Sequence, residues 1–262
     1  MRETNMVLTP HPNVIEQMDF QTDAGLGQVA RIGLICLQTD QTIEHEMATL
    51  LQGDGIARYH ARIPNAMEVT PDTLGQMQCD LPKAAALLPA QFDFDAIGYG
   101  CTSGATMIGE DRVADIIREI HPNAQVSNPI TACKAALAAL NIARIALLTP
   151  YAPDVTGEMQ TNLNAAGIAI NAVASFNQSD DFTVARITSA SILDAVKTIG
   201  ARDDCDAVFV SCTSLRALPV IAQSEAYLGK PVITSNQALG WHLARLANLT
   251  HSPANSGQLF QH

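Results

Sequence analysis

The residues best suited to chemistry are two cysteines that occur in two copies of one short phrase. Residues 95–103 read Asp-Ala, an apolar run and then Cys-Thr-Ser, and residues 206–214 repeat that pattern. The cysteines, Cys101 and Cys212, are 212 − 101 = 111 residues apart. Each follows a run typical of a buried strand and precedes an expected helix, where amide N–H groups and the helix dipole lower a thiol pKa. Two such thiols facing one substrate would form an acid–base pair.

Two further matches in the same order indicate an internal duplication. Residues 30–35 resemble residues 143–148, and residues 126–132 loosely resemble residues 232–238. Self-similarity that keeps its order along a chain is the sequence signature of repeated structural units. The sequence therefore predicts two similar halves, each with one copy of the duplicated cysteine.

The elements that must position these cysteines alternate between strand and helix. Strands are predicted near residues 30–37, 56–62, 94–100, 124–127, 143–149, 168–174, 206–211 and 231–234. The clearest helices are predicted over 104–120 and 181–199, from their apolar spacing. Strict alternation indicates an α/β fold with parallel sheets and right-handed crossovers. Residues 1–27 show no such periodicity and are predicted to form an N-terminal arm.

Composition narrows the class of protein. The chain has 262 residues, of which 47% are hydrophobic and 16% charged, as expected for two globular cores. Its net charge of −11 argues against a nucleic acid or an anionic membrane as a partner. No apolar stretch reaches the roughly 18–20 residues that a membrane span needs, and we expect a cytoplasmic protein. The six cysteines show no Cys-x-x-Cys spacing, so thiols are expected rather than disulfides or a metal site.

Each candidate residue has a plainer interpretation. Cys36, Cys79, Cys133 and Cys205 are expected to be ordinary packing residues, as most cysteines are. The hydroxyl residues after the two candidate cysteines can be helix N-caps, substrate carboxylate ligands or both. These residues are Thr102, Ser103, Thr213 and Ser214.

Three more candidates lie just past predicted strands. Asp40 follows the first strand and can be an N-cap, Tyr151 follows the fifth and can donate to a substrate oxygen, and Asn177 follows the sixth and can be a turn residue. Arg62 and Arg216 can be carboxylate clamps or solvated surface residues. His60, His121 and His242 lack metal-ligand spacing, and no glycine-rich phosphate loop follows a strand, so no nucleotide cofactor is expected.

Several segments carry a family resemblance. The duplicated Cys-Thr-Ser strands and Thr-Pro-Tyr at 149–151 resemble the aspartate/glutamate racemase superfamily, which includes maleate isomerases and arylmalonate decarboxylases. Segments 99–104, 127–132, 148–151, 211–216 and 229–238 are most similar to its ectoine-utilisation EutA branch.

The resemblance implies two flavodoxin-like domains related by a pseudo-twofold axis, with a cofactor-free active site in the cleft between them. The implied domains are residues 1–128 plus 236–262, and residues 129–235. It places the catalytic pair of the family on Cys101 and Cys212, and substrate-binding roles on Tyr151 and Asn177. The expected assembly is a homo-oligomer, a dimer or tetramer, with a small carboxylate as substrate.

One residue departs from the family pattern. Maleate isomerases carry an asparagine where this chain has Asp40, and a second substrate carboxylate ~4 Å from Asp40 would cost about 1–4 kcal/mol. The sequence therefore predicts a two-cysteine racemase or isomerase that acts at the carbon alpha to a carboxylate, with a role in ectoine breakdown. The alternatives are a maleate-type cis–trans isomerase, an arylmalonate-type decarboxylase with its single cysteine, and a non-catalytic small-carboxylate binding protein.

Overall fold

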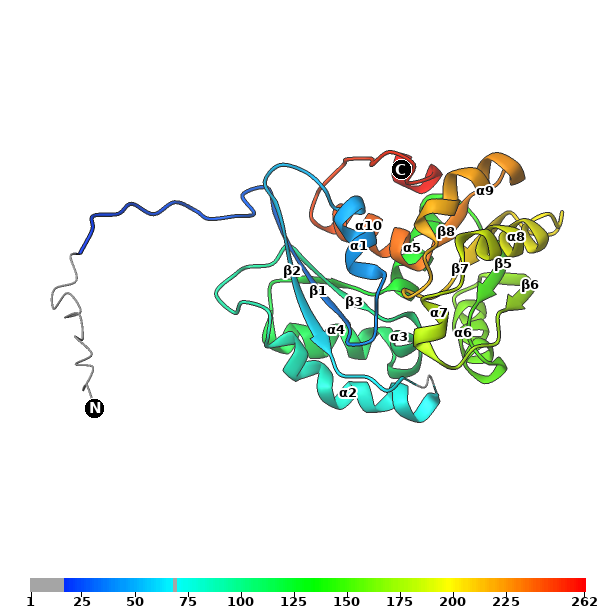
Figure 1. Ribbon diagram of the computed structural model, residues 1–262, viewed down its shortest axis with the longest axis horizontal. Coiled ribbons are helices and arrows are strands. Elements are labelled where there is room, and N and C mark those ends of the chain that lie inside the picture. Colours follow the sequence, from blue (N-terminus) through cyan, green and yellow to red (C-terminus); the bar gives the residue numbers. More distant parts are fainter. Residues whose placement is uncertain (1–16, 68–69) are drawn as a thin grey trace, which may run out of the picture.

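The computed structural model describes residues 17–67 and 70–262, and Figure 1 shows its two halves next to each other. Within these residues the strands form two parallel four-stranded sheets, in the orders β2-β1-β3-β4 and β6-β5-β7-β8. The first sheet contains β1 (Ala30–Leu37), β2 (Ile56–Ile63), β3 (Ala96–Gly100) and β4 (Gln125–Ser127). The second contains β5 (Arg144–Thr149), β6 (Ala169–Ser175), β7 (Ala207–Val210) and β8 (Val232–Thr234). All eight predicted strands are confirmed, and both halves share one topology.

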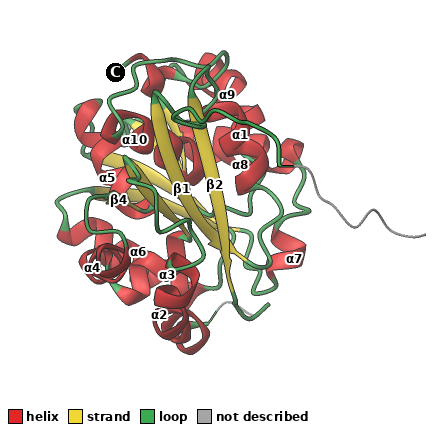
Figure 2. Ribbon diagram, turned by 90° about the vertical axis from the view of Figure 1, so that its left-hand side faces the viewer, coloured by secondary structure: helices red, strands yellow, loops and turns green. Residues whose placement is uncertain are grey.

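The inner strands are covered on both faces. Every residue of β3 and of β7 is buried, whereas the edge strand β6 is partly exposed along its whole length. Continuous apolar runs of this kind are typical of strands that lie between two helical layers. In the first half, α1 and α10 cover one face of the sheet, and α2 and α4 cover the other (Figure 2).

The helices of the described residues fill the intervals between strands. They are α1 (Ile43–Leu50), α2 (Pro71–Ala85), α3 (Thr102–Ile108), α4 (Glu110–Ile120), α5 (Pro129–Ala139), α6 (Pro153–Ala165), α7 (Asp181–Val184), α8 (Ser189–Gly200), α9 (Ile221–Leu228) and α10 (Ser235–Leu246). Two short 3-10 helices, η1 (Leu218–Val220) and η2 (Gln258–Gln261), complete them.

Two predicted helices are each divided in two, so those predictions are wrong in extent. The helix expected over 104–120 is interrupted at Gly109, whose φ of +95° is a conformation that glycine adopts readily. The helix expected over 181–199 is α7 followed by α8. Thr188 starts α8 by accepting the N–H of Ser191, because its side chain satisfies a donor that the helix start leaves free.

The last long helix returns to the first half of the chain. α10 lies against β3, β4 and α1, and also against α5. The division into residues 1–128 plus 236–262 and residues 129–235 remains a proposal: it places α10 with the first sheet and α5, which α10 also contacts, with the second.

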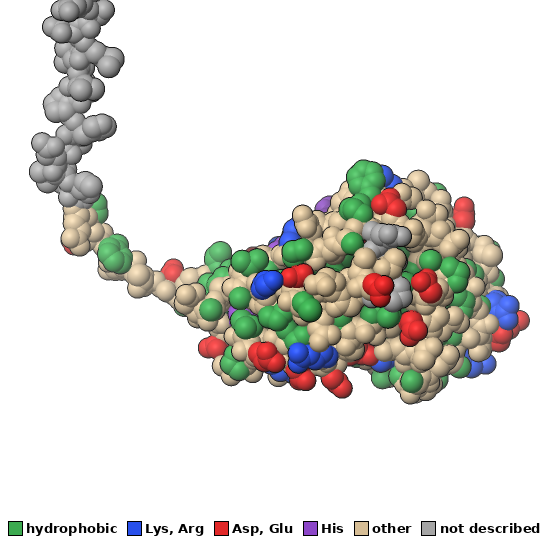
Figure 3. All heavy atoms as spheres, turned by 90° about the horizontal axis from the view of Figure 1, so that it is seen from below, with side chains coloured by type: hydrophobic (Ala, Val, Ile, Leu, Met, Phe, Trp, Pro, Cys, Tyr) green, Lys and Arg blue, Asp and Glu red, His purple; other side chains and the backbone are tan. Residues whose placement is uncertain are grey.

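The charged side chains on the surface are of both signs, and those of the described residues form no basic patch on the face drawn in Figure 3. Lys and Arg side chains are scattered there among acidic ones. No helix in the described ranges is long and apolar enough to cross a membrane. Residues 17–27 form neither helix nor strand and are mostly exposed, and the rest of the predicted arm, residues 1–16, lies outside the described residues.

Candidate active site

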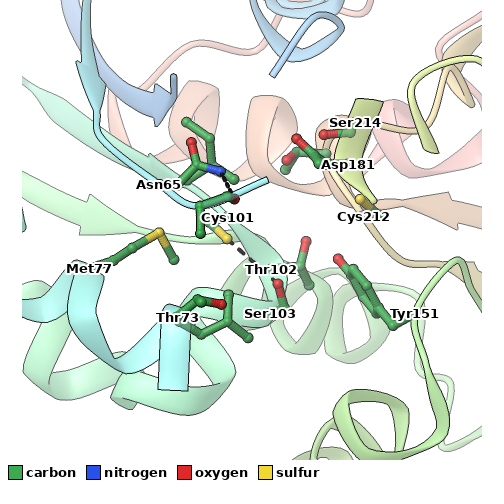
Figure 4. Close-up of a pocket in the computed structure, with 14 residues that line it drawn as sticks. Asn65, Thr73, Met77, Cys101, Thr102, Ser103, Tyr151, Asp181, Cys212 and Ser214 are labelled. Carbon is green, nitrogen blue, oxygen red and sulfur yellow. Dashed lines mark hydrogen bonds between the residues drawn. The ribbon is translucent and has the colours of Figure 1, made fainter. Parts of the chain in front are cut away.

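One narrow cavity lies between the two halves and is lined by both candidate cysteines (Figure 4). Its volume is about 20 Å³, which is room for about one water molecule. A substrate can therefore occupy it only if the walls move apart. The lining residues are Leu37, Asn65, Ala66, Thr73, Leu74, Met77, Cys101, Thr102, Ser103, Tyr151, Asp181, Cys212, Thr213 and Ser214.

Cys101 lies where β3 ends and α3 begins. It is the N-cap of α3, and its sulfur accepts the N–H of Gly104 at 3.2 Å. The hydroxyl of Ser103 lies 3.7 Å from the same sulfur. Both groups favour the thiolate over the thiol, because they can donate to a negatively charged sulfur. The predicted junction of strand and helix is confirmed for this cysteine.

Cys212 lies at the equivalent end of β7 but in a different local structure. No helix follows it directly: the chain bends through residues 213–215 and reaches η1 only at Leu218. The prediction of a helix start at this second cysteine is therefore wrong. Cys212 has a φ of +115°, a conformation that costs a residue other than glycine about 1–3 kcal/mol. Such strain persists only where surrounding contacts hold the backbone in place.

Hydrogen bonds from other elements hold this strained segment. The N–H of Cys212 donates to Ser235 Oγ at 3.0 Å, and that hydroxyl lies 2.8 Å from Thr102 Oγ1. Thr213 Oγ1 donates to the carbonyl of Gly100 at 3.3 Å. The loops that carry the two cysteines are thereby linked directly and through Ser235.

The four candidate residues with hydroxyl groups differ in whether those groups are already hydrogen-bonded within the protein. Thr102 and Thr213 line the cavity, but their hydroxyls bond to the protein in this state. Ser214 Oγ is buried and has no hydrogen-bond partner among the described residues, so it is available to a ligand. Ser103 lies beside Cys101 and faces Tyr151 across the cavity floor (Figure 4).

Burial reverses the expected shift in thiol acidity. Burial raises the pKa of Cys101 from 9.0 to about 11, although the Gly104 N–H and Ser103 hydroxyl lower it. The pKa of Cys212 is raised further, first by burial and then by the charge of Asp181. Burial also raises the pKa of Tyr151, which faces Cys212 and Ser103 as a neutral phenol. At neutral pH both cysteines are therefore thiols in the closed, ligand-free state.

This result predicts slow, strongly pH-dependent alkylation of the two cavity cysteines. With iodoacetamide and peptide mass spectrometry, the rate at Cys101 should rise about tenfold per pH unit from pH 8 to 10, because the thiolate is the nucleophile. Cys212 should react later than Cys101. The exposed thiol of Cys79 is the internal reference. Cavity thiols that react as fast as Cys79 at pH 7 would contradict the assignment.

Two predicted ligands of the substrate do not line the cavity. Asp40 is buried behind it, where its Oδ1 accepts the N–H groups of Thr42 at 2.7 Å and Ile43 at 2.8 Å. Asn177 is exposed in the loop after β6 and has a φ of +50°. Asp40 therefore stabilises the start of α1 from two residues before its N-cap, Thr42, and Asn177 is a loop residue.

The cationic candidates also lie elsewhere. Arg62 is paired with Glu44 and donates to three backbone carbonyls after β1. Arg216 donates to the carbonyls of Arg186 and Ile187. Among the residues that the structure describes, no three His, Cys, Asp or Glu side chains are grouped so as to hold a metal ion.

The sequence analysis missed Asp181 and Asn65, which both line the cavity. They follow β6 and β2, the equivalent edge strands of the two halves. The duplication contained a signal for them, since loops after equivalent parallel strands meet at the same edge of the site.

The protein has two parallel β-sheets with the same strand order, and one cysteine from the end of a strand in each sheet lines the same cavity. These features define a class of α/β proteins with paired cysteines. The profile of the family described as "Arylmalonate decarboxylase" matches residues 121–260. The chain belongs to that family.

Individual relatives agree with this membership. A maleate isomerase of Geobacillus stearothermophilus is 24% identical over 242 residues, covering 87% of this chain and 96% of the relative. An arylmalonate decarboxylase of Bordetella bronchiseptica is 32% identical over 118 residues, covering 45% of this chain and 49% of the relative. The Nocardia farcinica maleate cis-trans isomerase, solved as a mutant with a covalently bound succinylcysteine intermediate, has the same fold. It matches with a TM-score of 0.82 and 23% identity, over 88% of this chain and 98% of that one.

Proposed function

We propose that this protein is a cofactor-independent isomerase of a small carboxylic acid that uses Cys101 and Cys212 together. The observation that carries the proposal is that these two thiols, at the ends of equivalent strands of the two sheets, line one narrow cavity. Among the related proteins, the maleate isomerases favour the cis–trans alternative over the racemase that the sequence analysis placed first. A succinylcysteine in one of them supports covalent chemistry at a cysteine.

The surroundings of the two sulfurs favour Cys101 as the nucleophile. Its pKa, at about 11, is the lower of the two, and the Gly104 N–H already points at its sulfur. Forming its thiolate at pH 8 costs about 4 kcal/mol, from three pKa units. Cys212, whose pKa is raised further, is protonated at neutral pH and faces the Tyr151 phenol, so it has a proton to transfer to the substrate.

The reaction then proceeds in two steps, an addition to the double bond and an elimination. The Cys101 thiolate bonds to one alkene carbon, and the π electrons move to the carbon alpha to the carboxylate, which takes the Cys212 proton. The former double bond is now single and rotates. The Cys212 thiolate removes a proton from that carbon, the double bond re-forms with the opposite geometry, and the carbon–sulfur bond breaks. This returns the Cys101 thiolate and the Cys212 thiol.

The same pair could instead racemise an amino acid, with one sulfur removing the alpha proton and the other delivering one. The motifs that resemble the ectoine-utilisation branch support this second candidate and an ectoine-derived substrate. Decarboxylation, the activity for which the family is described, needs only one cysteine and leaves the second without a role.

Proton NMR in deuterated water tests these candidates on maleate, a phenylmalonate and ectoine-derived amino acids. We expect a new alkene isomer, or exchange of an alpha proton, and no release of carbon dioxide. In the Cys212→Ala variant water must supply the proton of the first step, and mass spectrometry should find a substrate adduct on the Cys101 peptide, because no second thiolate is left to remove that proton. Carbon dioxide release would favour the decarboxylase. If no compound reacts although ligands bind, the non-catalytic binding protein becomes the better account.

A further inference from the structure

The cavity carries one negative charge and no positive one. Of the residues that line it, Asp181 is the one carboxylate, and none is Lys, Arg or His. Asp181 is 4% exposed, and no cation pairs with it among the described residues. Burying a carboxylate without a cation costs free energy, and a ligand that brings a positive charge would recover it.

A short hydrogen-bond chain fixes the carboxylate in place. The side-chain N–H of Asn65 donates to Thr39 Oγ1 at 2.8 Å, so the single hydroxyl proton of Thr39 is left for Asp181 Oδ2, 2.5 Å away. The backbone N–H of Asp181 donates to the carbonyl of Met67 at 3.1 Å. Thr39, Asn65 and Met67 belong to the first half, so Asp181 is held against the site from across the cavity.

The carboxylate accepts one hydrogen bond from these residues, which leaves most of its acceptor capacity unused. In Figure 4, Asp181 and Ser214 lie on one side of the cavity, and Ser103 and Tyr151 lie on the other. One wall therefore offers a negative charge, and the facing wall offers neutral hydroxyl donors. A ligand that satisfies both carries a positive donor group at one end and a carboxylate at the other.

We infer that Asp181 selects substrates with an ammonium group, so that the substrate is an amino monocarboxylate, unsaturated for cis–trans isomerisation or saturated for the racemase candidate, rather than a dicarboxylate such as maleate. This inference rests on the proposed function, since it assumes that the substrate occupies this cavity. The like-charge argument made for Asp40 from the sequence applies instead to Asp181, because Asp181 lines the cavity and Asp40 does not. A second carboxylate beside Asp181 would be repelled, whereas an ammonium group would be attracted and could donate to it.

Binding of an ammonium group would also prepare the chemistry. The charge of Asp181 is among the causes that raise the pKa of both cysteines, after burial. A substrate cation beside Asp181 offsets that charge. The pKa values of the two thiols then fall toward neutral pH, so a thiolate forms more easily. The substrate itself would then complete the activation of the site.

The test compares two four-carbon probes, maleate and 2,4-diaminobutyrate, by calorimetric titration of the full chain. Wild-type protein should bind diaminobutyrate at least ~10-fold more tightly than maleate, and Asp181→Asn should reduce that ratio by at least ~10-fold. Asparagine keeps the shape of the side chain and an oxygen for Thr39, so it removes mainly the charge. Thermal unfolding of each variant checks that it is folded.

Asp180→Asn is the matched control. Asp180 is the neighbouring residue but does not line the cavity, and it caps α7 by accepting the N–H of Thr183 at 2.9 Å. Asparagine caps helices equally well, so this variant should keep the wild-type ratio. Tighter binding of maleate by the wild type, no binding of either probe, or an unchanged ratio in Asp181→Asn would overturn the inference. Because binding needs no turnover, the expected ratios without any isomerisation would refute only the proposed function.

Discussion

Replacing Cys101 by serine is expected to lower turnover by ~10³-fold or more, and Cys212→Ser should do the same. A serine hydroxyl is far less acidic than a thiol, so it supplies neither the nucleophile nor the acid at neutral pH. Serine is a good N-cap and can accept the Gly104 N–H in place of the Cys101 sulfur. The loss should therefore be chemical rather than structural, which the unfolding temperature of each variant checks.

The two variants should fail at different steps. Cys101→Ser cannot form the covalent adduct, whereas Cys212→Ser can form it only with a proton from water and has no thiolate to remove that proton again. If the reaction is racemisation, each variant should instead retain solvent exchange from one enantiomer, with opposite preferences. Steady-state rates, adduct mass and deuterium incorporation separate these outcomes.

Cys133→Ala is the control for removing a buried thiol. Cys133 is fully buried on α5 and does not line the cavity, so its loss should leave turnover unchanged. Near-normal turnover in Cys101→Ser together with a dead Cys212→Ser would contradict the two-cysteine proposal. It would indicate the single-cysteine chemistry of a decarboxylase.

The free energy of unfolding is expected to depend on pH through Glu46, a buried residue that helps to hold the Cys212 loop. Its Oε2 accepts from Asn236 Nδ2 at 2.8 Å, and its Oε1 accepts the N–H of Leu218 at 3.0 Å. The same Asn236 Nδ2 donates to the carbonyl of Thr213 at 2.8 Å. Glu46 on α1 therefore connects the first half to the segment that follows Cys212.

Burial raises the pKa of Glu46 from 4.5 to about 7, against the lowering effect of its hydrogen bonds. Between these two values the folded state binds more protons than the unfolded state, so stability falls as pH rises. The contribution of protonated Glu46 to the free energy of unfolding is complete below pH 4.5 and lost above pH 7. It amounts to roughly 3 kcal/mol. Glu46→Gln should remove this dependence, because glutamine does not titrate.

Denaturant unfolding of both proteins from pH 4.5 to 8 measures the effect. The wild type should lose stability relative to Glu46→Gln across that range, while any constant offset reflects the altered hydrogen bonds. Glu158→Gln, which changes an exposed acid on α6, should leave the wild-type profile intact. A stability difference that does not vary with pH would show that Glu46 titrates normally in the folded protein.

The sequence was sufficient for the strands and for the place of the two cysteines at strand ends. Strand positions follow from short apolar runs between turn residues, which is local information, and all eight are confirmed. Helix extents were less predictable. The breaks at Gly109 and before Thr188 depend on caps and backbone angles that apolar spacing does not record.

The candidate site was only partly predictable. Tyr151 and the hydroxyls after each cysteine line the cavity, but Asp40 and Asn177 do not, and Asp181 was missed. Asp181 is six residues beyond the end of β6, and its role depends on Thr39 and Asn65 in the other half. Contacts between residues more than a hundred positions apart have no local signal in one sequence.

By itself, the sequence determined that this protein has two similar α/β halves, each with a cysteine at the end of its third strand. These features follow from side-chain hydrophobicity and its period along the chain. Only the tertiary structure decided the acidity of those cysteines and the charge beside them. Burial between the halves raises both thiol pKa values, and the packing of α7 against the first half brings Asp181 into the cavity. Desolvation and Coulomb interactions depend on distances across the fold, and these exist only once both halves have assembled.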